Sequence, residues 1–147
     1  MSPRAYPRAV STLGGSARIV RVVPVQGGVQ GQVELVVGEG DTAAAMGSGD
    51  VPVLATPRVL ALCEEAACVA IADRLKEGET TVGLRIELTH IAPTKVGSRV
   101  RAEATLERME GRRMVFTVTV SDACGLVAAG KLTRAVVDRA SFLDKSR

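Results

Sequence analysis

Aromatic residues are almost absent from this sequence: they make up 2% of its 147 residues, and tryptophan does not occur. Tyr6, Phe116 and Phe142 are the complete set. The hydrophobic core must therefore be built from aliphatic side chains. A surface that binds nucleic acid by stacking bases on several aromatic rings is disfavoured for the same reason.

Histidine and cysteine are also scarce, with one histidine, His90, and three cysteines. A single imidazole excludes a metal site built from several histidines. Cys63, Cys68 and Cys124 follow no metal-ligand spacing, and their odd number is typical of reduced cytoplasmic thiols. No apolar run approaches the roughly 18 residues that span a bilayer. The sequence thus predicts a cytoplasmic chain with no metal centre and no membrane segment.

Acidic residues are missing from residues 1–33, which contain four arginines, so the rest of the chain has a net charge of −1. The remainder therefore lacks the basic field that is typical of nucleic-acid-binding proteins. We expect residues 1–30 to form a poorly ordered basic extension, with an early strand over 17–25. Residues 31–147 have the length of one domain.

Hydrophobic periodicity predicts one strand, one long helix and then four strands. Alternating apolar and polar residues predict strands over 31–37, 81–90, 98–109, 114–120 and 126–137. Residues 56–78, rich in alanine and leucine, predict the helix. Thr56 fits its N-cap, Pro57 its first helical position and Gly78 its stop. An apolar helix packed against one antiparallel sheet is the α+β arrangement that this order favours.

Glu64 interrupts an apolar stripe of the predicted helix. At about 100° per residue, one face carries Leu60, Glu64, Ala67, Cys68, Ile71 and Leu75. A carboxylate in such a stripe is costly unless it is paired, hydrogen-bonded or protonated. Glu64 is therefore a candidate functional residue, largely screened from water, and its replacement by glutamine should not destabilise the fold. The alternative is that this side of the helix is exposed.

His90 is the polar exception on a strand face. The alternation puts on one face Val82, Leu84, Ile86, Leu88 and His90. A lone histidine there is either a satisfied structural residue or, with Glu64 across a helix–sheet interface, part of a general base. We expect His90 and Glu64 to share one pocket. Gly83, on the opposite face of this strand, indicates the close approach of a ligand or of backbone.

Thr56 allows two interpretations. It can cap the helix, or it can stand beside backbone N–H groups, those of Arg58 and Val59, that hold an oxyanion. A hydroxyl, a carboxylate, an imidazole and exposed amides around one helix fit acyl transfer, in which water or a hydroxyl attacks a carbonyl.

Four segments resemble the fluoroacetyl-CoA thioesterase-like family of hot-dog thioesterases: 53–67, 81–97, 110–113 and 133–137. The resemblance covers roughly residues 32–140. The family's catalytic Thr and Glu lie eight residues apart, and its His lies 26 beyond the Glu. Thr56, Glu64 and His90 reproduce both spacings. Gly83 matches a glycine seven residues before that His, and Arg134 an arginine of the last strand.

The resemblance implies a hot-dog fold, in which an antiparallel sheet wraps one long helix, usually as a homodimer with acyl-CoA entering near the interface. It implies that Thr56, Glu64 and His90 are catalytic, that Gly83 and Arg134 bind substrate, and that no metal or bound cofactor is needed. The expected activity is hydrolysis of a small or medium aliphatic acyl-CoA to free acid and CoA. Since a helix starting at Thr56 puts its Cα about 12 Å from that of Glu64, either Thr56 precedes the helix or the two flank the substrate.

The sequence leaves open the acyl group that the protein prefers and two alternatives to thioester hydrolysis. The family's aromatic lid residue, six before its Thr, corresponds to Asp50, so no marked preference for fluoroacetyl over acetyl groups is expected. One alternative function is a non-catalytic acyl-CoA-binding protein of the same fold. Another alternative is a hot-dog hydratase, which by resemblance would carry an acid only a few residues before its histidine, on one loop. Residues 84–89 contain Glu87 as their single acid, and the alternation puts it on the strand face opposite to His90.

Overall fold

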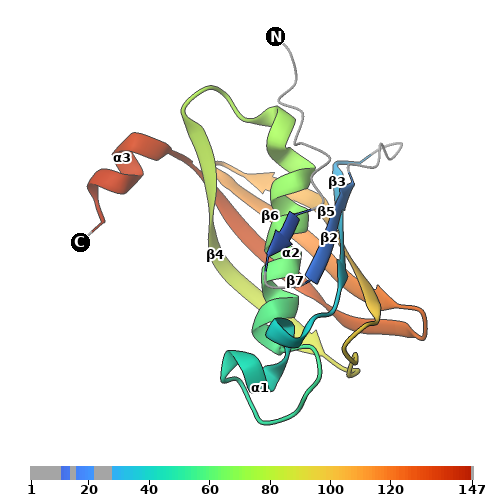
Figure 1. Ribbon diagram of the computed structural model, residues 1–147. Helices are drawn as coiled ribbons and strands as arrows, with labels where there is room; N and C mark the ends of the chain where they lie inside the picture. The colour runs from blue at the N-terminus through green and yellow to red at the C-terminus, as the bar shows by residue number, and fades with distance from the viewer. Residues whose placement is uncertain (1–10, 14–15, 22–27, 147) are drawn as a thin grey trace.

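The computed structural model describes residues 11–13, 16–21 and 28–146. The described strands form one seven-stranded antiparallel sheet that curves around a long helix (Figure 1). The strands are β1 Ser11–Leu13, β2 Ser16–Arg21, β3 Gln30–Val36, β4 Glu79–His90, β5 Arg99–Glu110, β6 Arg113–Asp122 and β7 Gly125–Asp138. The helices are α1 Ala43–Met46, α2 Thr56–Ile71 and α3 Arg139–Asp144, with 3₁₀ turns η1 Glu39–Asp41 and η2 Ala72–Arg74.

The sheet order is β1-β2-β3-β5-β6-β7-β4, and every neighbouring pair is antiparallel. β3 to β7 are the five predicted strands, with α2 as the predicted helix. The predicted strand over 17–25 overlaps β2, while its residues 22–25 lie outside the described part of the chain. β1 and β2, which precede residue 31 in the chain, add two strands to the sheet next to β3. The predicted division into an extension over residues 1–30 and a domain over 31–147 stays a prediction.

Helix α2 begins and ends differently from the sequence prediction. Ala55, not Thr56, is the N-cap, and Thr56 is the first helical residue. The α-helix ends at Ile71 rather than near Gly78, because the chain tightens into η2 and Leu75 is already extended. Leu75 packs against the core there, so the helix stops where its chain must turn back toward the sheet.

The buried face of α2 is rotated by about one residue, or about 100°, from the predicted stripe. Its buried residues are Val59, Leu62, Cys63, Ala66, Ala67, Val69, Ala70 and Ile71. The reason is a close approach to β3: a Cβ on Gly31 would lie 2.2 Å from the Ala66 carbonyl oxygen and 2.6 Å from the Ala70 nitrogen. Small side chains therefore face the sheet, and Glu64 lies at the border of the buried face.

A β-bulge in β4 changes the predicted strand faces. Gly83 pairs with Arg134 of β7, but Arg85 pairs with the adjacent Thr133, so Leu84 is an extra residue. The bulge shifts the alternation by one residue. Gly83 and His90, which uninterrupted alternation puts on opposite faces, both face α2 as a result.

The short helix α3 lies at the C-terminal end of the fold. α3 leads away from the sheet at the C-terminal end of β7 (Figure 1). Its Phe142 and Leu143 are exposed. Among the described helices, none is both long and apolar enough to cross a membrane.

Candidate active site

Thr56 and His90 form a direct contact between α2 and β4. Thr56 Oγ1 lies 2.8 Å from His90 Nδ1, at hydrogen-bond distance. The Thr56 hydroxyl is free for this contact because the N-cap position is taken by Ala55, which makes no side-chain cap. The first residue of the helix is therefore joined to the last residue of the strand.

The backbone amides at the start of α2 differ from the expectation. The N–H groups of Arg58 and Val59 both donate to the Ala55 carbonyl oxygen, each at 3.0 Å, so neither is free for an oxyanion. Pro57 has no N–H. The Thr56 N–H has no hydrogen-bond partner among the described residues. Within the described part of the chain, the one open backbone donor at this helix end thus belongs to Thr56, which also carries the hydroxyl.

Glu64 and Arg134 form an ion pair between α2 and β7. Arg134 Nη1 donates to Glu64 Oε2 at 2.8 Å. Arg134 also donates to the Thr81 hydroxyl and carbonyl oxygens, at 3.1 and 2.9 Å. The side chain of Arg134 is 8% exposed, whereas that of Glu64 is 34% exposed. The expectation that Glu64 is largely screened from water is therefore wrong, because it lies at the border of the buried face.

Gly83 lies against this ion pair. A Cβ at Gly83 would stand 2.7 Å from Glu64 Oε2 and 3.5 Å from Arg134 Nη1. The sequence indicated close approach of a ligand or of backbone, whereas the group that approaches Gly83 is a side chain, the Glu64 carboxylate. Thr81 was missed by the sequence argument. Its position two residues before Gly83, on the same strand face, is the signal that would have found it.

The site residues form two pairs along α2. Thr56 belongs to the helix, so its Cα is about 12 Å from that of Glu64 and the two residues do not touch. Among the described residues, no hydrogen bond or ion pair joins Glu64 to His90. Their convergence on one pocket stays a prediction.

Cys63 precedes Glu64 but is not a nucleophile candidate. Burial raises the pKa of its thiol to about 12, and the neighbouring Glu64 carboxylate adds to the effect. A thiol with that pKa stays protonated near neutral pH. Within the described ranges, histidine, cysteine and acidic side chains form no group of three that could hold a metal ion.

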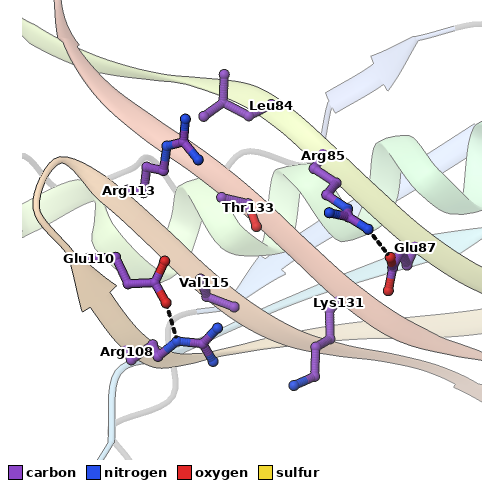
Figure 2. A pocket seen from close by; sticks show the side chains of 9 residues that line it. All are labelled: Leu84, Arg85, Glu87, Arg108, Glu110, Arg113, Val115, Lys131 and Thr133. Carbon is purple, nitrogen blue, oxygen red and sulfur yellow. Dashed lines mark hydrogen bonds and ion pairs between the residues drawn. The ribbon is translucent and has the colours of Figure 1, made fainter.

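A shallow groove of about 560 Å³ lies on the other face of the sheet (Figure 2). Thr133, which lines it, alternates with Leu132 and Arg134 on the α2 side. Glu87 in this groove pairs with Arg85, and so faces away from His90 as the sequence predicted. The groove is therefore separate from the Thr56 and Glu64 pairs.

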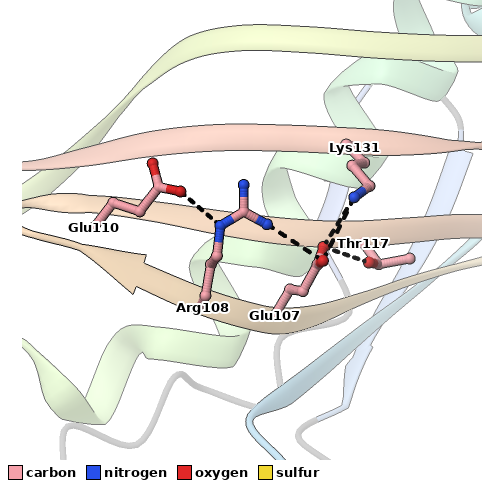
Figure 3. Close-up of polar contacts among 5 residues, drawn as sticks. All are labelled: Glu107, Arg108, Glu110, Thr117 and Lys131. Carbon is pink, nitrogen blue, oxygen red and sulfur yellow. Dashed lines mark hydrogen bonds and ion pairs between the residues drawn. The ribbon is translucent and has the colours of Figure 1, made fainter.

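Charges beside this groove are paired with one another. Glu107 accepts from Lys131, Thr117 and Arg108, and Arg108 also pairs with Glu110 (Figure 3). The Lys131 ammonium, hydrogen-bonded to Glu107, lowers the pKa of that carboxyl. This is a solvated network of opposite charges rather than a basic surface.

Solved thioesterase structures share the fold. The structure of the fluoroacetyl-CoA thioesterase FlK matches with a TM-score of 0.76 and 29% identity, over 84% of this chain and 96% of that chain. A thioesterase superfamily member from Thermus thermophilus matches with a TM-score of 0.75 and 30% identity, over 82% and 90%. The protein is thus an α+β protein of the hot-dog fold and a thioester hydrolase.

Sequence comparison identifies the family. The family model described as fluoroacetyl-CoA-specific thioesterase, FlK, matches residues 37–140. The fluoroacetyl-CoA thioesterase of Streptantibioticus cattleyicolor is 36% identical over 95 residues, which are 65% of this chain and 68% of that protein. The chain belongs to the FlK thioesterase family, as its sequence motifs predicted.

Proposed function

We propose that this protein hydrolyses a small or medium aliphatic acyl-CoA to free acid and CoA. One observation carries the proposal. Glu64 has one carboxylate oxygen held by Arg134, while its Oε1 has no hydrogen-bond partner among the described residues. This carboxylate lies on the same helix as Thr56, whose hydroxyl is held by His90 of β4, so one helix carries both a fixed base and a fixed hydroxyl.

Glu64 acts as the general base in the proposed reaction. Its free Oε1 accepts a proton from water while the water oxygen attacks the thioester carbonyl carbon. The tetrahedral intermediate then loses the CoA sulfur, and Glu64 returns the proton to the leaving thiolate. Arg134 is engaged by Glu64 and Thr81, so we assign it the role of holding the carboxylate. Gly83 leaves room for that carboxylate and for the acyl group.

Thr56 stabilises the oxyanion, with its O–H and its open N–H as donors. His90 Nε2 is buried and has no partner among the described residues. Nε2 is unpaired in either tautomer, as a donor or as an acceptor, so its burial does not choose between them. The proposed reaction uses the tautomer with its proton on Nδ1, which donates to Thr56 Oγ1. The Thr56 proton is then available to the thioester carbonyl.

The acyl group is expected to be selected by size rather than by fluorine. Asp50, at the position of the family's aromatic lid, is exposed in the loop before α2. Phe116 is fully buried in the core, and Phe142 lies on α3. Aliphatic lining discriminates at about 0.8 kcal/mol per buried methylene. A short or medium aliphatic chain is the substrate that this supports.

A panel assay tests the function and its specificity together. Free CoA is measured with a thiol reagent for acetyl-, butyryl-, hexanoyl-, octanoyl- and fluoroacetyl-CoA. We expect release from at least one aliphatic substrate, and kcat/KM for fluoroacetyl-CoA within about a hundredfold of that for acetyl-CoA, or 2.7 kcal/mol. A larger fluoroacetyl preference would contradict the size argument. Saturable binding of acyl-CoA without any release would establish the non-catalytic alternative.

The active unit is proposed to be a homodimer in the cytoplasm. β4 is an edge of the described sheet and is twelve residues long, with β7 as its single neighbour. A long free edge favours pairing with a second copy. Because β4 carries Gly83 and His90, such pairing would put the partner beside the site. Sedimentation velocity should give twice the 15.3 kDa mass of one chain at assay concentration, and a monomer there would refute the dimer.

A further inference from the structure

Helix α2 begins without a side-chain cap. Its N-cap, Ala55, has no side chain that accepts a hydrogen bond, and the Thr56 hydroxyl is used by His90. The first turn of a helix has backbone N–H groups without intrahelical partners, and a missing cap lets that turn open. Thr56 lies in this turn, so another group must hold it.

Asp41, at the end of η1, holds the turn from outside the helix. Its backbone oxygen accepts from the Ala55 N–H at 2.9 Å. Its carboxylate Oδ1 accepts from Arg58 Nε at 2.9 Å, and Oδ2 accepts from the Gly38 N–H at 2.8 Å. Ala55 and Arg58 bracket Thr56 in the chain. One residue therefore holds the Ala55 backbone on one side of Thr56 and the Arg58 side chain on the other.

The ion pair between Asp41 and Arg58 is well protected from solvent. The side chain of Asp41 is 8% exposed and that of Arg58 is 19% exposed. An ion pair with this burial is little screened by salt. The pair is therefore a firm anchor rather than a fluctuating surface contact.

We propose that Asp41 is a positioning residue for Thr56. It fixes the first turn of α2 and thereby the hydrogen bond between Thr56 and His90. Asp41 itself does not touch the substrate. The inference rests on the proposed function, in which the Thr56 donors must meet the carbonyl oxygen of the thioester. A displacement of about 1 Å in such a group can cost roughly a hundredfold in rate.

The test is Asp41→Asn, which keeps the size of the side chain and removes its charge. We expect kcat to fall by roughly 10- to 100-fold with KM little changed, because the turn moves but the acyl-CoA contacts remain. Asp41→Glu, which keeps the charge, should restore part of the lost kcat.

Glu34→Gln is the matched control. The Glu34 side chain is also 8% exposed, and it accepts a hydrogen bond from the Arg101 guanidinium. Glu34 lies on β3 and Arg101 on β5, so this ion pair does not involve the first turn of α2. Both variants lose one buried charge and should lose comparable thermal stability. Only Asp41→Asn should lower kcat. Equal loss of kcat in the two variants would show general destabilisation and would overturn the proposal.

The ring nitrogens of His90 give a readout that does not depend on activity. His90 is the only histidine, so a chain without a His tag gives one set of imidazole ¹⁵N signals. In Asp41→Asn we expect the Nδ1 signal to move toward its position in Thr56→Val, which lacks the hydroxyl. Glu34→Gln should keep the wild-type signal. An unchanged Nδ1 signal in Asp41→Asn would overturn the inference. A wild-type protein that cleaves no acyl-CoA would refute the proposed function, while this signal still tests the anchor.

Discussion

Replacing Glu64 with glutamine is expected to lower kcat by roughly 10²- to 10⁴-fold, because an amide cannot take a proton from water. The fold should survive, since the amide oxygen can still accept from Arg134 Nη1. A loss of about 1–2 kcal/mol in the free energy of unfolding is expected, between the values for exposed and buried ion pairs. This differs from the sequence expectation of no destabilisation, because the buried Arg134 loses its counter-charge.

Two measurements on the same preparation check this result. CoA release gives kcat, and urea unfolding gives the free energy of unfolding. Glu65→Gln, the next position on α2, makes the same chemical change and should keep wild-type turnover. If Glu64→Gln turns over its preferred substrate at the wild-type rate, the carboxylate is structural and the proposed base is wrong.

Replacing Gly83 with alanine is expected to lower kcat by roughly a hundredfold while the protein remains folded. The added Cβ would lie 2.7 Å from Glu64 Oε2, a distance that real Cβ atoms do not tolerate. The Glu64 side chain is flexible and can rotate away, so the steric cost to the fold is small. The rotation separates the carboxylate from Arg134 and moves the base off its position.

Gly28→Ala is the control for this substitution. A Cβ at Gly28 would meet the Thr105 methyl group at 3.9 Å, an ordinary contact. Both glycines gain the same methyl group, but only Gly83→Ala should lose activity. The steady-state parameters and circular dichroism of the two variants make the comparison. A fully active Gly83→Ala would mean that the position of the Glu64 carboxylate does not limit the rate.

The strand over residues 99–110 shows what local sequence can predict. Val100, Ala102 and Ala104 are buried, as the alternation required, because one face of β5 packs on α2 and the other meets solvent. The other strands and the helix are also buried on one face, and the resulting hydrophobic periodicity is why the order of the elements could be predicted from the sequence. The spacing of Thr56, Glu64 and His90 was likewise a property of the sequence, and it indicated the family that the comparisons then identified.

The sequence did not predict in the same way which residues of β4 and α2 face the site. An alternation of period two contains no sign of an extra residue, so the bulge at Leu84 and the turning of Gly83 toward Glu64 required the β4–β7 pairing. The rotation of α2 required its close approach to Gly31. A hydrophobicity pattern favours leucine over alanine for the buried face of a helix, whereas the close contact between the backbones of α2 and β3 requires the smaller side chain there.

The sequence by itself determined the order of the elements, the aliphatic core and the identity of the polar residues that stand out from apolar patterns. Only the tertiary structure decided their partners. Thr56 is 34 residues from His90, Glu64 is 70 from Arg134, and Asp41 is 17 from Arg58. Each contact joins elements whose distance depends on how the sheet curves around α2. Local periodicity reports which face of an element is buried, but the partner across that face is set by packing.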